Sequence, residues 1–153
     1  MRLTVEDNSL QVAKNFEKQV REQPQIVKTA LGRTAEFLMG IIKQRTTRGQ
    51  SADGNSFLPY TEAYKTFRSN AGRQTQFPDL TFSGQMLSNI TQKSSPTEAI
   101  IYFANKFQNT KALGNQKKRK FFAIGAREIK PIMNVFMREY NKLSTIKWAN
   151  EKI

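Results

Sequence analysis

The sequence contains neither cysteine nor histidine among its 153 residues. Without cysteine, disulfides, thiolate metal sites and thiol catalysis are all excluded. Without histidine, the chain lacks the commonest general base and the commonest protein ligand for metals at neutral pH. Serine–histidine and cysteine–histidine catalytic arrangements are therefore impossible within this chain.

Acidic residues are also scarce, with 12 aspartates and glutamates against 25 lysines and arginines. The acids are scattered, and the sequence has neither a phosphate-binding P-loop motif nor a glycine-rich dinucleotide-binding motif. These absences argue against an enzyme and predict no cofactor. A hydrolase that works with carboxylates alone is the remaining enzymatic alternative.

Long apolar runs are missing as well. No stretch approaches the roughly 18 apolar residues that a membrane-spanning helix needs, and the N-terminal sequence MRLTVEDNSL lacks the apolar core of a signal peptide. We therefore expect a protein that is made in the cytoplasm and has no membrane partner. The length, with 38% hydrophobic residues, suits a single domain over residues 1–153 with a real core.

What the sequence does have is positive charge, at a net +13 that is unevenly spread. Seven cations and no acid lie between Glu98 and Glu128. We predict a basic loop at about residues 105–120, and its cations are Lys106, Lys111, Lys117, Lys118, Arg119 and Lys120. Such a patch favours an anionic partner, either nucleic acid, anionic lipid or an acidic protein face. A solvated loop that only aids solubility is an equally good interpretation.

Apolar periodicity predicts helices at both ends of the chain. A weak helical stripe begins at Ser9 and runs to about Glu22, and Pro24 is expected to break it. A stronger stripe follows and should end near Thr47, with Gly49 in the left-handed terminal conformation. Near the other end, a long helix is predicted from about residue 127 to about residue 146, with a proline in its first turn.

Between these helices, residues 45–90 form a long polar connection. Ordinary domains rarely carry a connection of this length unless it has a function. Thr61 is a good N-cap for a short helix over Glu62–Ser69, and Ser83 can cap another helical turn that ends near Leu87. The sequence therefore predicts an extended arm at about 45–90 that is interrupted by short helices.

Strand signals follow the arm. Leu87–Lys93 and Glu98–Ala104 are separated by Ser94-Ser95-Pro96, which predicts a β-hairpin, and Arg119–Ile124 is a candidate third strand. The predicted fold class is therefore α+β: N-terminal helices, a long loop with short helices, a small antiparallel sheet of a hairpin plus a third strand, and a long C-terminal helix. We expect the two long helices to cover one face of the sheet.

Three motifs have competing interpretations. Asp53-Gly54-Asn55 has some likeness to a calcium loop, but the other ligands are missing and a tight turn explains it. The lysine cluster beside Phe121 and Phe122 could bind nucleic acid, although both rings lie in an apolar run typical of a core. The amphipathic C-terminal helix suits a membrane surface or, more ordinarily, packing on the sheet.

The order of three short motifs carries a family resemblance. The residues concerned are Asp53, Gly54, Phe57, Pro59 and Tyr60, then Leu80, Thr81, Ser83, Gly84, Met86, Leu87 and Ile90, and finally Arg119, Phe121, Phe122 and Ile124. This ordered set, over roughly residues 29–143, resembles the virion morphogenesis and tail-completion (head–tail joining) proteins of tailed phages, including the Mu-like group. The chain departs from the family pattern at residues 106–120, where many relatives have aromatic, histidine or glutamine-glycine residues.

The resemblance implies a structural virion protein that acts in tail completion or head–tail joining as a ring subunit in the neck or connector. The implied partners are other copies of the chain, other neck, tail or connector proteins, and DNA in the channel, and the implied location is the virion. On this hypothesis the arm packs on an adjacent subunit or on the tail tube, and the six cations contact a partner surface or DNA.

Aromatic residues and methionine dominate buried protein contacts, so we predict interface anchors within the arm. They are Phe57, Tyr60, Leu80, Phe82 and Met86. Packing inside the chain's own core is an equally weighted alternative for each of them. The alternative function is that of a small basic nucleic-acid-binding protein without sequence specificity.

Overall fold

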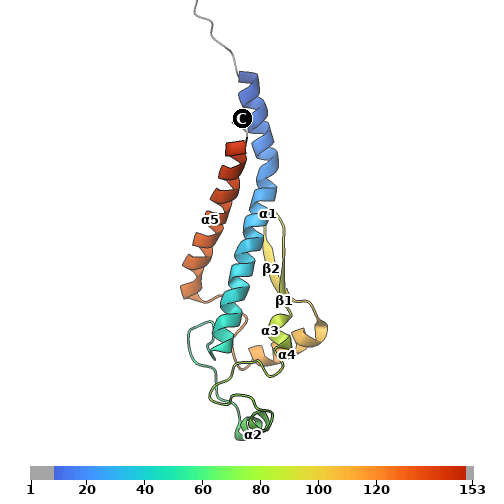
Figure 1. The fold of residues 1–153 in the computed structure, drawn as a ribbon, viewed down its shortest axis with the longest axis vertical. Helices are drawn as coiled ribbons and strands as arrows, with labels where there is room; N and C mark the ends of the chain where they lie inside the picture. The colour runs from blue at the N-terminus through green and yellow to red at the C-terminus, as the bar shows by residue number, and fades with distance from the viewer. Residues whose placement is uncertain (1–8, 151–153) are drawn as a thin grey trace, which may run out of the picture.

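The structure, a computed structural model, describes residues 9–150 of the chain. Its elements are α1 (Ser9–Thr47), α2 (Glu62–Asn70), α3 (Gln85–Ser88), β1 (Ile90–Ser94), β2 (Ala99–Phe103), α4 (Lys106–Gln116) and α5 (Ala126–Asn150). Figure 1 shows an elongated molecule in which two long helices run side by side and the short elements gather at one end. The predicted α+β class is confirmed.

The predicted break at Pro24 is wrong, because α1 continues through it as one helix of 39 residues. A proline inside a helix removes one hydrogen bond and costs about 3 kcal/mol. Here the neighbouring residues are held against α5: Gln23 Nε2 donates to the hydroxyl of Tyr140 at 2.8 Å, and Ile26 is buried. Packing on both sides of Pro24 therefore keeps the helix continuous.

The end of α1 follows the prediction. Gly49 has a φ of 75°, and the Gly49 and Gln50 amides donate to the carbonyl oxygens of Thr46 and Arg45 at 3.0 and 2.9 Å. This pair of bonds is the Schellman arrangement, which satisfies carbonyls that the helix would leave open. A side chain at position 49 would also collide with Phe77, so glycine is required there for two reasons.

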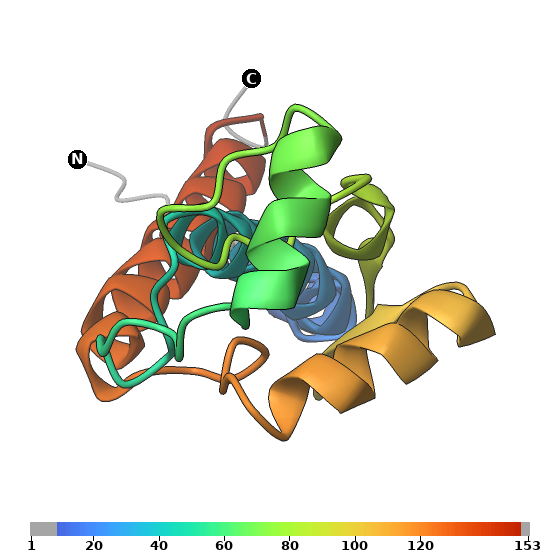
Figure 2. The ribbon, with the colours of Figure 1, turned by 90° about the horizontal axis from the view of Figure 1, so that it is seen from below.

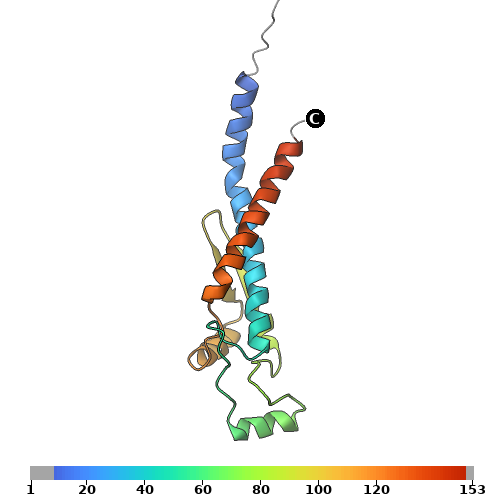
Figure 3. The ribbon, with the colours of Figure 1, turned by 90° about the vertical axis from the view of Figure 1, so that its left-hand side faces the viewer.

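The long helices and the hairpin form three layers, with α1 in the middle (Figure 1). We expected both long helices on one face of the sheet, but α5 packs on α1, and of the two long helices only α1 packs on the hairpin. Figure 3 shows α1 and α5 crossing and then diverging towards the chain ends. Beyond the apolar contacts, Arg33 joins the two helices through an ion pair to Glu139 at 2.9 Å.

The hairpin is antiparallel, with Ile90 opposite Phe103 and Gln92 opposite Ile101. A β-carbon at Gly32 of α1 would lie 3.1 Å from Ser94 Oγ, so the face with Ile90, Gln92 and Ser94 meets α1. Alternation along a strand then places Ile100 and Tyr102 on the other face, where they are 37% and 40% exposed. The outer face of the sheet thus stays open in the single chain.

The predicted third strand at 119–124 is wrong, since the sheet has two strands within the part of the chain that the structure describes. Arg45 captures this segment instead. Its buried guanidinium donates to the carbonyl oxygens of Phe121, at 2.7 Å, and Ala123, and pairs with the carboxylate of Glu128. The carbonyls that a sheet ladder would need are therefore committed to the end of α1.

The predicted basic loop at 105–120 is wrong over most of its length, because residues 106–116 form helix α4. Asn105 starts the helix, and its side-chain oxygen accepts from the amides of Phe107 and Gln108 at 2.8 and 3.3 Å. Gly114 lies inside this helix. The N-cap outweighs the poor helix propensity of Gly114, since a good cap contributes about 1 kcal/mol.

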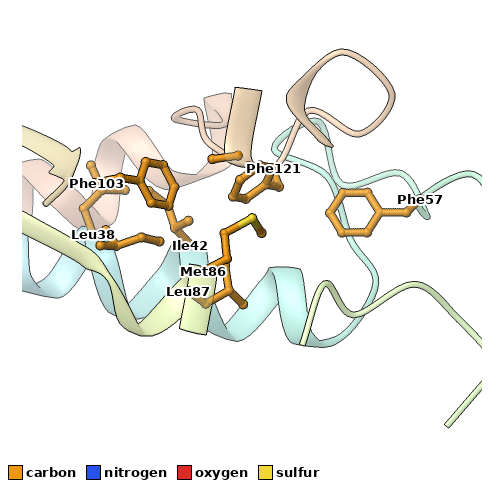
Figure 4. Packing of buried hydrophobic residues seen from close by; sticks show 9 residues of the cluster. Leu38, Ile42, Phe57, Met86, Leu87, Phe103 and Phe121 are labelled. Carbon is orange, nitrogen blue, oxygen red and sulfur yellow. The ribbon is translucent and has the colours of Figure 1, made fainter. Parts of the chain in front are cut away.

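The core lies where α1, α3, the hairpin and α4 meet. Figure 4 shows its side chains converging on Phe121, with Phe57 set to one side. The buried cluster consists of Leu38, Ile42, Phe57, Met86, Leu87, Ile90, Phe103, Ala112 and Phe121. Phe121 has no exposed surface, as the apolar run around it predicts. The core thereby fixes α3 and α4 beside the end of α1.

Candidate interaction surface

The stretch between α1 and α3, residues 48–84, is called the arm loop. It projects past the end of α1 and carries α2 at its far end (Figures 1 and 3). Seen from below in Figure 2, α2 lies in front of the end of α1, and α4 and α5 lie to either side. The predicted helix in this stretch is confirmed, with Thr61 as its N-cap.

Backbone hydrogen bonds hold the base of the arm loop. Gln50 and Ser56 form an isolated antiparallel bridge, and Phe57 N donates to Gly49 O at 2.7 Å. Ala52 N donates to Lys120 O at 2.9 Å. Gly125 is needed beside this bond, because a β-carbon there would overlap the carbonyl oxygen of Ala52. The loop is thus tied to both flanks of the core.

Further out, the arm loop is held by a buried ion pair. Arg68 of α2 is 1% exposed, and its Nη2 lies 3.0 and 3.1 Å from the two carboxylate oxygens of Asp79. Arg68 Nε donates to Gln74 O at 2.9 Å, and Gln74 Nε2 donates to Asp79 Oδ2 at 2.7 Å. The Tyr60 hydroxyl lies 3.3–3.4 Å from its partners in this network. The charges are therefore paired and hydrogen-bonded, as burial requires.

The network shifts two pKa values. Burial alone would raise the pKa of Asp79, but hydrogen bonds from Gln74 and Thr81 and the charge of Arg68 outweigh it, so its pKa lies below the ordinary 3.8. Burial also raises the pKa of Tyr60 above 10.0. Asp79 is thus ionised and Tyr60 neutral over the whole physiological range.

One residue of the network has unusual backbone geometry. Leu80 has a φ of 55°, a left-handed conformation that is uncommon for residues other than glycine. Its amide donates to the Tyr60 hydroxyl at 3.3 Å, and Thr81 N donates to Asp79 Oδ1 at 3.0 Å. The hydrogen bonds on both sides hold Leu80 in this conformation and aim its side chain inward.

Aromatic rings extend from the network to the surface of the arm loop. The ring of Tyr60 meets Tyr64 edge-on at 4.9 Å, Tyr64 stacks on Phe67 at 5.9 Å, and Phe67 stacks on Phe82 at 5.2 Å. The guanidinium groups of Arg68 and Arg119 lie 4.9 and 5.2 Å from the Tyr60 ring centre. Such contacts contribute about 0.5–1.5 kcal/mol per pair and stiffen the arm loop.

A cleft of about 590 Å³ separates the arm loop from α4. Its lining is Leu58, Pro59, Tyr60, Thr61, Tyr64, Arg68, Leu80, Phe82, Ser83, Gly84, Met86, Gln108, Lys111, Asn115, Lys118 and Arg119. Most arm residues in this set are apolar or aromatic, whereas α4 and the turn after it supply amides and cations. The cleft is therefore the candidate site.

The six predicted cations separate into two groups. Lys111, Lys118 and Arg119 line the cleft, and Arg119 also donates to Leu58 O at 3.1 Å. The other three lie outside the cleft; Lys106 and Lys117 are exposed, and Lys120 pairs with Asp53 at 3.3 Å. The sequence predicts one basic loop, whereas in the structure three of the six cations line the cleft and three lie outside it.

Four of the five predicted interface anchors also line the cleft: Tyr60, Leu80, Phe82 and Met86. Tyr60 and Met86 are nonetheless largely buried in the single chain, and Leu80 and Phe82 are half-buried. Phe57 is buried in the core and does not line the cleft. Whether any of them contacts a partner stays a prediction.

Sequence reasoning missed Gln108, Asn115 and the pairing of Arg68 with Asp79. A helical register could have indicated Gln108 and Asn115, because positions 108, 111 and 115 are three and four residues apart and so share one face of a helix. The ion pair had no such signal, since Arg68 lies in the predicted short helix and Asp79 in the irregular segment after it, so no periodicity relates the two. The first omission follows from the predicted loop at 105–120, where the structure has α4.

Comparisons with protein-family models, with curated proteins and with solved structures find no match. Within residues 9–150, no group of three or more acidic residues is placed to hold a metal ion. None of the described helices is both long and apolar enough to cross a membrane. The case for a function therefore rests on the chain itself.

Proposed function

We propose that this protein is a structural virion protein of a tailed phage, which acts in tail completion or head–tail joining as a ring subunit in the neck or connector. The observation that carries the proposal is a pair of unlike apolar surfaces on opposite sides of the three layers. Because the surfaces differ, copies would join head to tail, and head-to-tail contacts generate rings when the rotation closes.

The first surface is on α5. Ile129, Met133 and Met137 recur every four residues and are 55%, 54% and 49% exposed. They lie on a helix whose other side packs on α1. A continuous apolar stripe on the outside of a chain is typical of a protein–protein contact.

The second surface is the outer face of the hairpin. Ile100 and Tyr102 lie there, away from α1, and Lys93 stands opposite Ile100. With α5 and the hairpin on opposite sides of α1, a neighbour's α5 could cover this face (Figure 1). The arm loop would remain free to reach another neck or tail protein.

Imaging of assembled particles tests the proposal most directly. We expect the chain as a symmetric ring on the particle axis, and we expect the double variant Met133→Glu/Met137→Glu to lose the ring while remaining folded. Lys130→Gln/Asn134→Glu, which changes the net charge equally at exposed positions of the same helix, is the matched control. Density for isolated copies away from the axis would contradict the proposal.

A second candidate function is nucleic-acid binding without sequence specificity, which the cations on and after α4 favour. A protein that neutralises several phosphates loses affinity steeply with salt, with a log–log slope near the number of contacts. Persistent binding of DNA by the monomer, lost when residues 117–120 are neutralised, would support this alternative. Weak binding with a shallow slope would dismiss it.

A further inference from the structure

The cleft between the arm loop and α4 has the chemistry of a ligand site. Leu58, Tyr64 and Phe82 contribute apolar surface from the arm loop, and Lys111 and Lys118 contribute positive charge from the other side. None of the residues that line it is acidic. Within residues 9–150, neither lysine forms an ion pair. The cleft is therefore complementary to a ligand that is both apolar and anionic.

A buried polar atom at the cleft lacks a partner. Gln108 is 8% exposed and lines the cleft from α4, and its Oε1 is buried without any hydrogen bond. Buried polar groups are nearly always paired, because an unpaired one costs about 1–3 kcal/mol. An amide oxygen accepts hydrogen bonds. The missing partner is therefore an N–H or O–H donor on the ligand.

The arrangement of the aromatic rings disfavours a nucleic acid as the ligand of this cleft. Single strands bind where bases can stack on free ring faces. The Tyr60 ring is already in contact with two guanidinium groups, and Tyr64 and Phe82 each stack on Phe67. These contacts join the rings of the arm loop to one another and to guanidinium groups, so at least one face of each ring is already covered.

We infer that the cleft binds a short acidic, apolar peptide segment of another protein. The segment's aliphatic or aromatic side chain enters between Leu58 and Met86, its carboxylates meet Lys111 and Lys118, and a backbone N–H donates to Gln108 Oε1. A second copy of this chain is the poorer occupant, because each copy carries a net charge of +13. The inference rests on the proposed function only in treating the partner as a protein of the assembly.

Peptide binding to the free subunit tests the charge requirement. The probes are an array of hexapeptides with two acidic and two aliphatic or aromatic residues, and the same peptides with glutamine and asparagine in place of the acids. We expect the acidic peptides to bind preferentially, and the tightest is then measured in solution by fluorescence anisotropy. Lys111→Glu/Lys118→Glu should weaken that peptide about tenfold, which two reversed surface contacts can supply.

Lys106→Glu/Lys117→Glu is the matched control, because it changes the net charge equally at exposed positions outside the cleft. We expect it to leave peptide affinity within about twofold, because neither residue lines the cleft and exposed charges are screened by salt. Equal weakening by both pairs would mean a general charge effect and would overturn the inference. So would tighter binding of a 20-nucleotide oligothymidine than of any peptide.

Replacement of Gln108 by leucine separates a ligand contact from a structural one. Gln108→Leu removes the unpaired oxygen, so the free protein should melt about 2–4 °C higher. The same variant should bind the peptide several-fold more weakly, because the acceptor for its N–H is gone. A lower melting temperature with unchanged peptide affinity would overturn the inference. Neither measurement depends on ring assembly, so the inference and the proposed function can fail separately.

Discussion

Around Phe121 the chain is held mainly by a large apolar cluster, to which Arg45 adds an ion pair with Glu128, whereas around Arg68 it is held mainly by an ion pair and hydrogen bonds. The first region includes α1, the hairpin and α4, and its cluster contains only apolar side chains. The second is the outer arm loop, where Arg68 and Asp79 are buried polar residues and Phe67 is 55% exposed. Apolar packing is tolerant of geometry, while a buried ion pair is stable only with all its partners in place.

The difference has a consequence for stability. The ion pairs Arg33–Glu139 and Arg45–Glu128 join the two long helices, and these helices bury a shared apolar surface as well. The arm loop has no comparable apolar cluster of its own, so its stability depends on Tyr60, Arg68, Gln74 and Asp79 acting together. We therefore expect the arm loop to open before the helical layers unfold.

Truncation of Phe121 should have the largest effect, because it removes a fully buried ring at the centre of the core. We expect Phe121→Ala to lower the free energy of unfolding by about 3–5 kcal/mol. Urea unfolding followed by far-ultraviolet circular dichroism measures this loss. Phe107→Ala, at a ring that is 64% exposed, should change it by less than about 0.5 kcal/mol. Similar losses for both variants would contradict the assigned core.

Loss of Arg68 should have the next largest effect and should be confined to the arm loop. Arg68→Met leaves the Asp79 carboxylate buried without its cation, which costs about 3 kcal/mol. Hydrogen exchange should show the α2 amides losing protection while the α1 and hairpin amides keep theirs. The double variant Arg68→Met/Asp79→Asn should recover part of the loss, because it leaves no unpaired charge.

Lys65→Met is the control for that experiment. Lys65 also pairs with an acid on α2, but its partner Glu62 has 87% of its side chain exposed. Exposed pairs of this kind contribute about 0.3–0.5 kcal/mol, so α2 should keep its protection. If Arg68→Met instead unfolded the whole chain, the two regions would be one cooperative unit.

Lowering the pH should reproduce the effect of Arg68→Met on the α2 amides, in a weaker form. The pKa of Asp79 is lower in the folded chain than the ordinary 3.8, so its contribution is fully present above pH 3.8 and is lost as the pH falls through the folded pKa. The α2 amides should lose protection in that window before those of α1. Asp79→Asn cannot titrate, and a protein that carries it should lack the transition.

The long helices and the hairpin were largely predictable from the sequence, whereas α4 was not. The periodicity in α1 and α5 and the β-formers flanking Ser95 reflect interactions between residues close in the chain. Two errors came from tertiary contacts that a local pattern does not show. Contacts with α5 keep α1 helical through Pro24. The guanidinium of Arg45 donates hydrogen bonds to carbonyl oxygens of the predicted third strand.

The cleft was predictable only in part. Its aromatic residues and cations stand out by type, so Tyr60, Phe82, Lys111 and Lys118 could be nominated from the sequence. Their convergence could not, because it depends on α4, and the sequence predicts a loop where Asn105 caps this helix. A buried, unpaired atom such as Gln108 Oε1 has no sequence signature at all, since its state is set by distant neighbours.

The smallest effect should come from the cap of α2, which tests the arm loop without changing its ion pair. Thr61 Oγ1 accepts from Tyr64 N at 3.4 Å, a long bond, so Thr61→Ala should cost about 0.5 kcal/mol, the low end for an N-cap. The expected result is faster hydrogen exchange in the first turn of α2 alone. Ser69→Ala, at an exposed position near the other end of the same helix, is the control and should leave that turn unchanged. If Thr61→Ala loosened the arm loop as far as Arg68→Met does, the ion pair would not be what holds it.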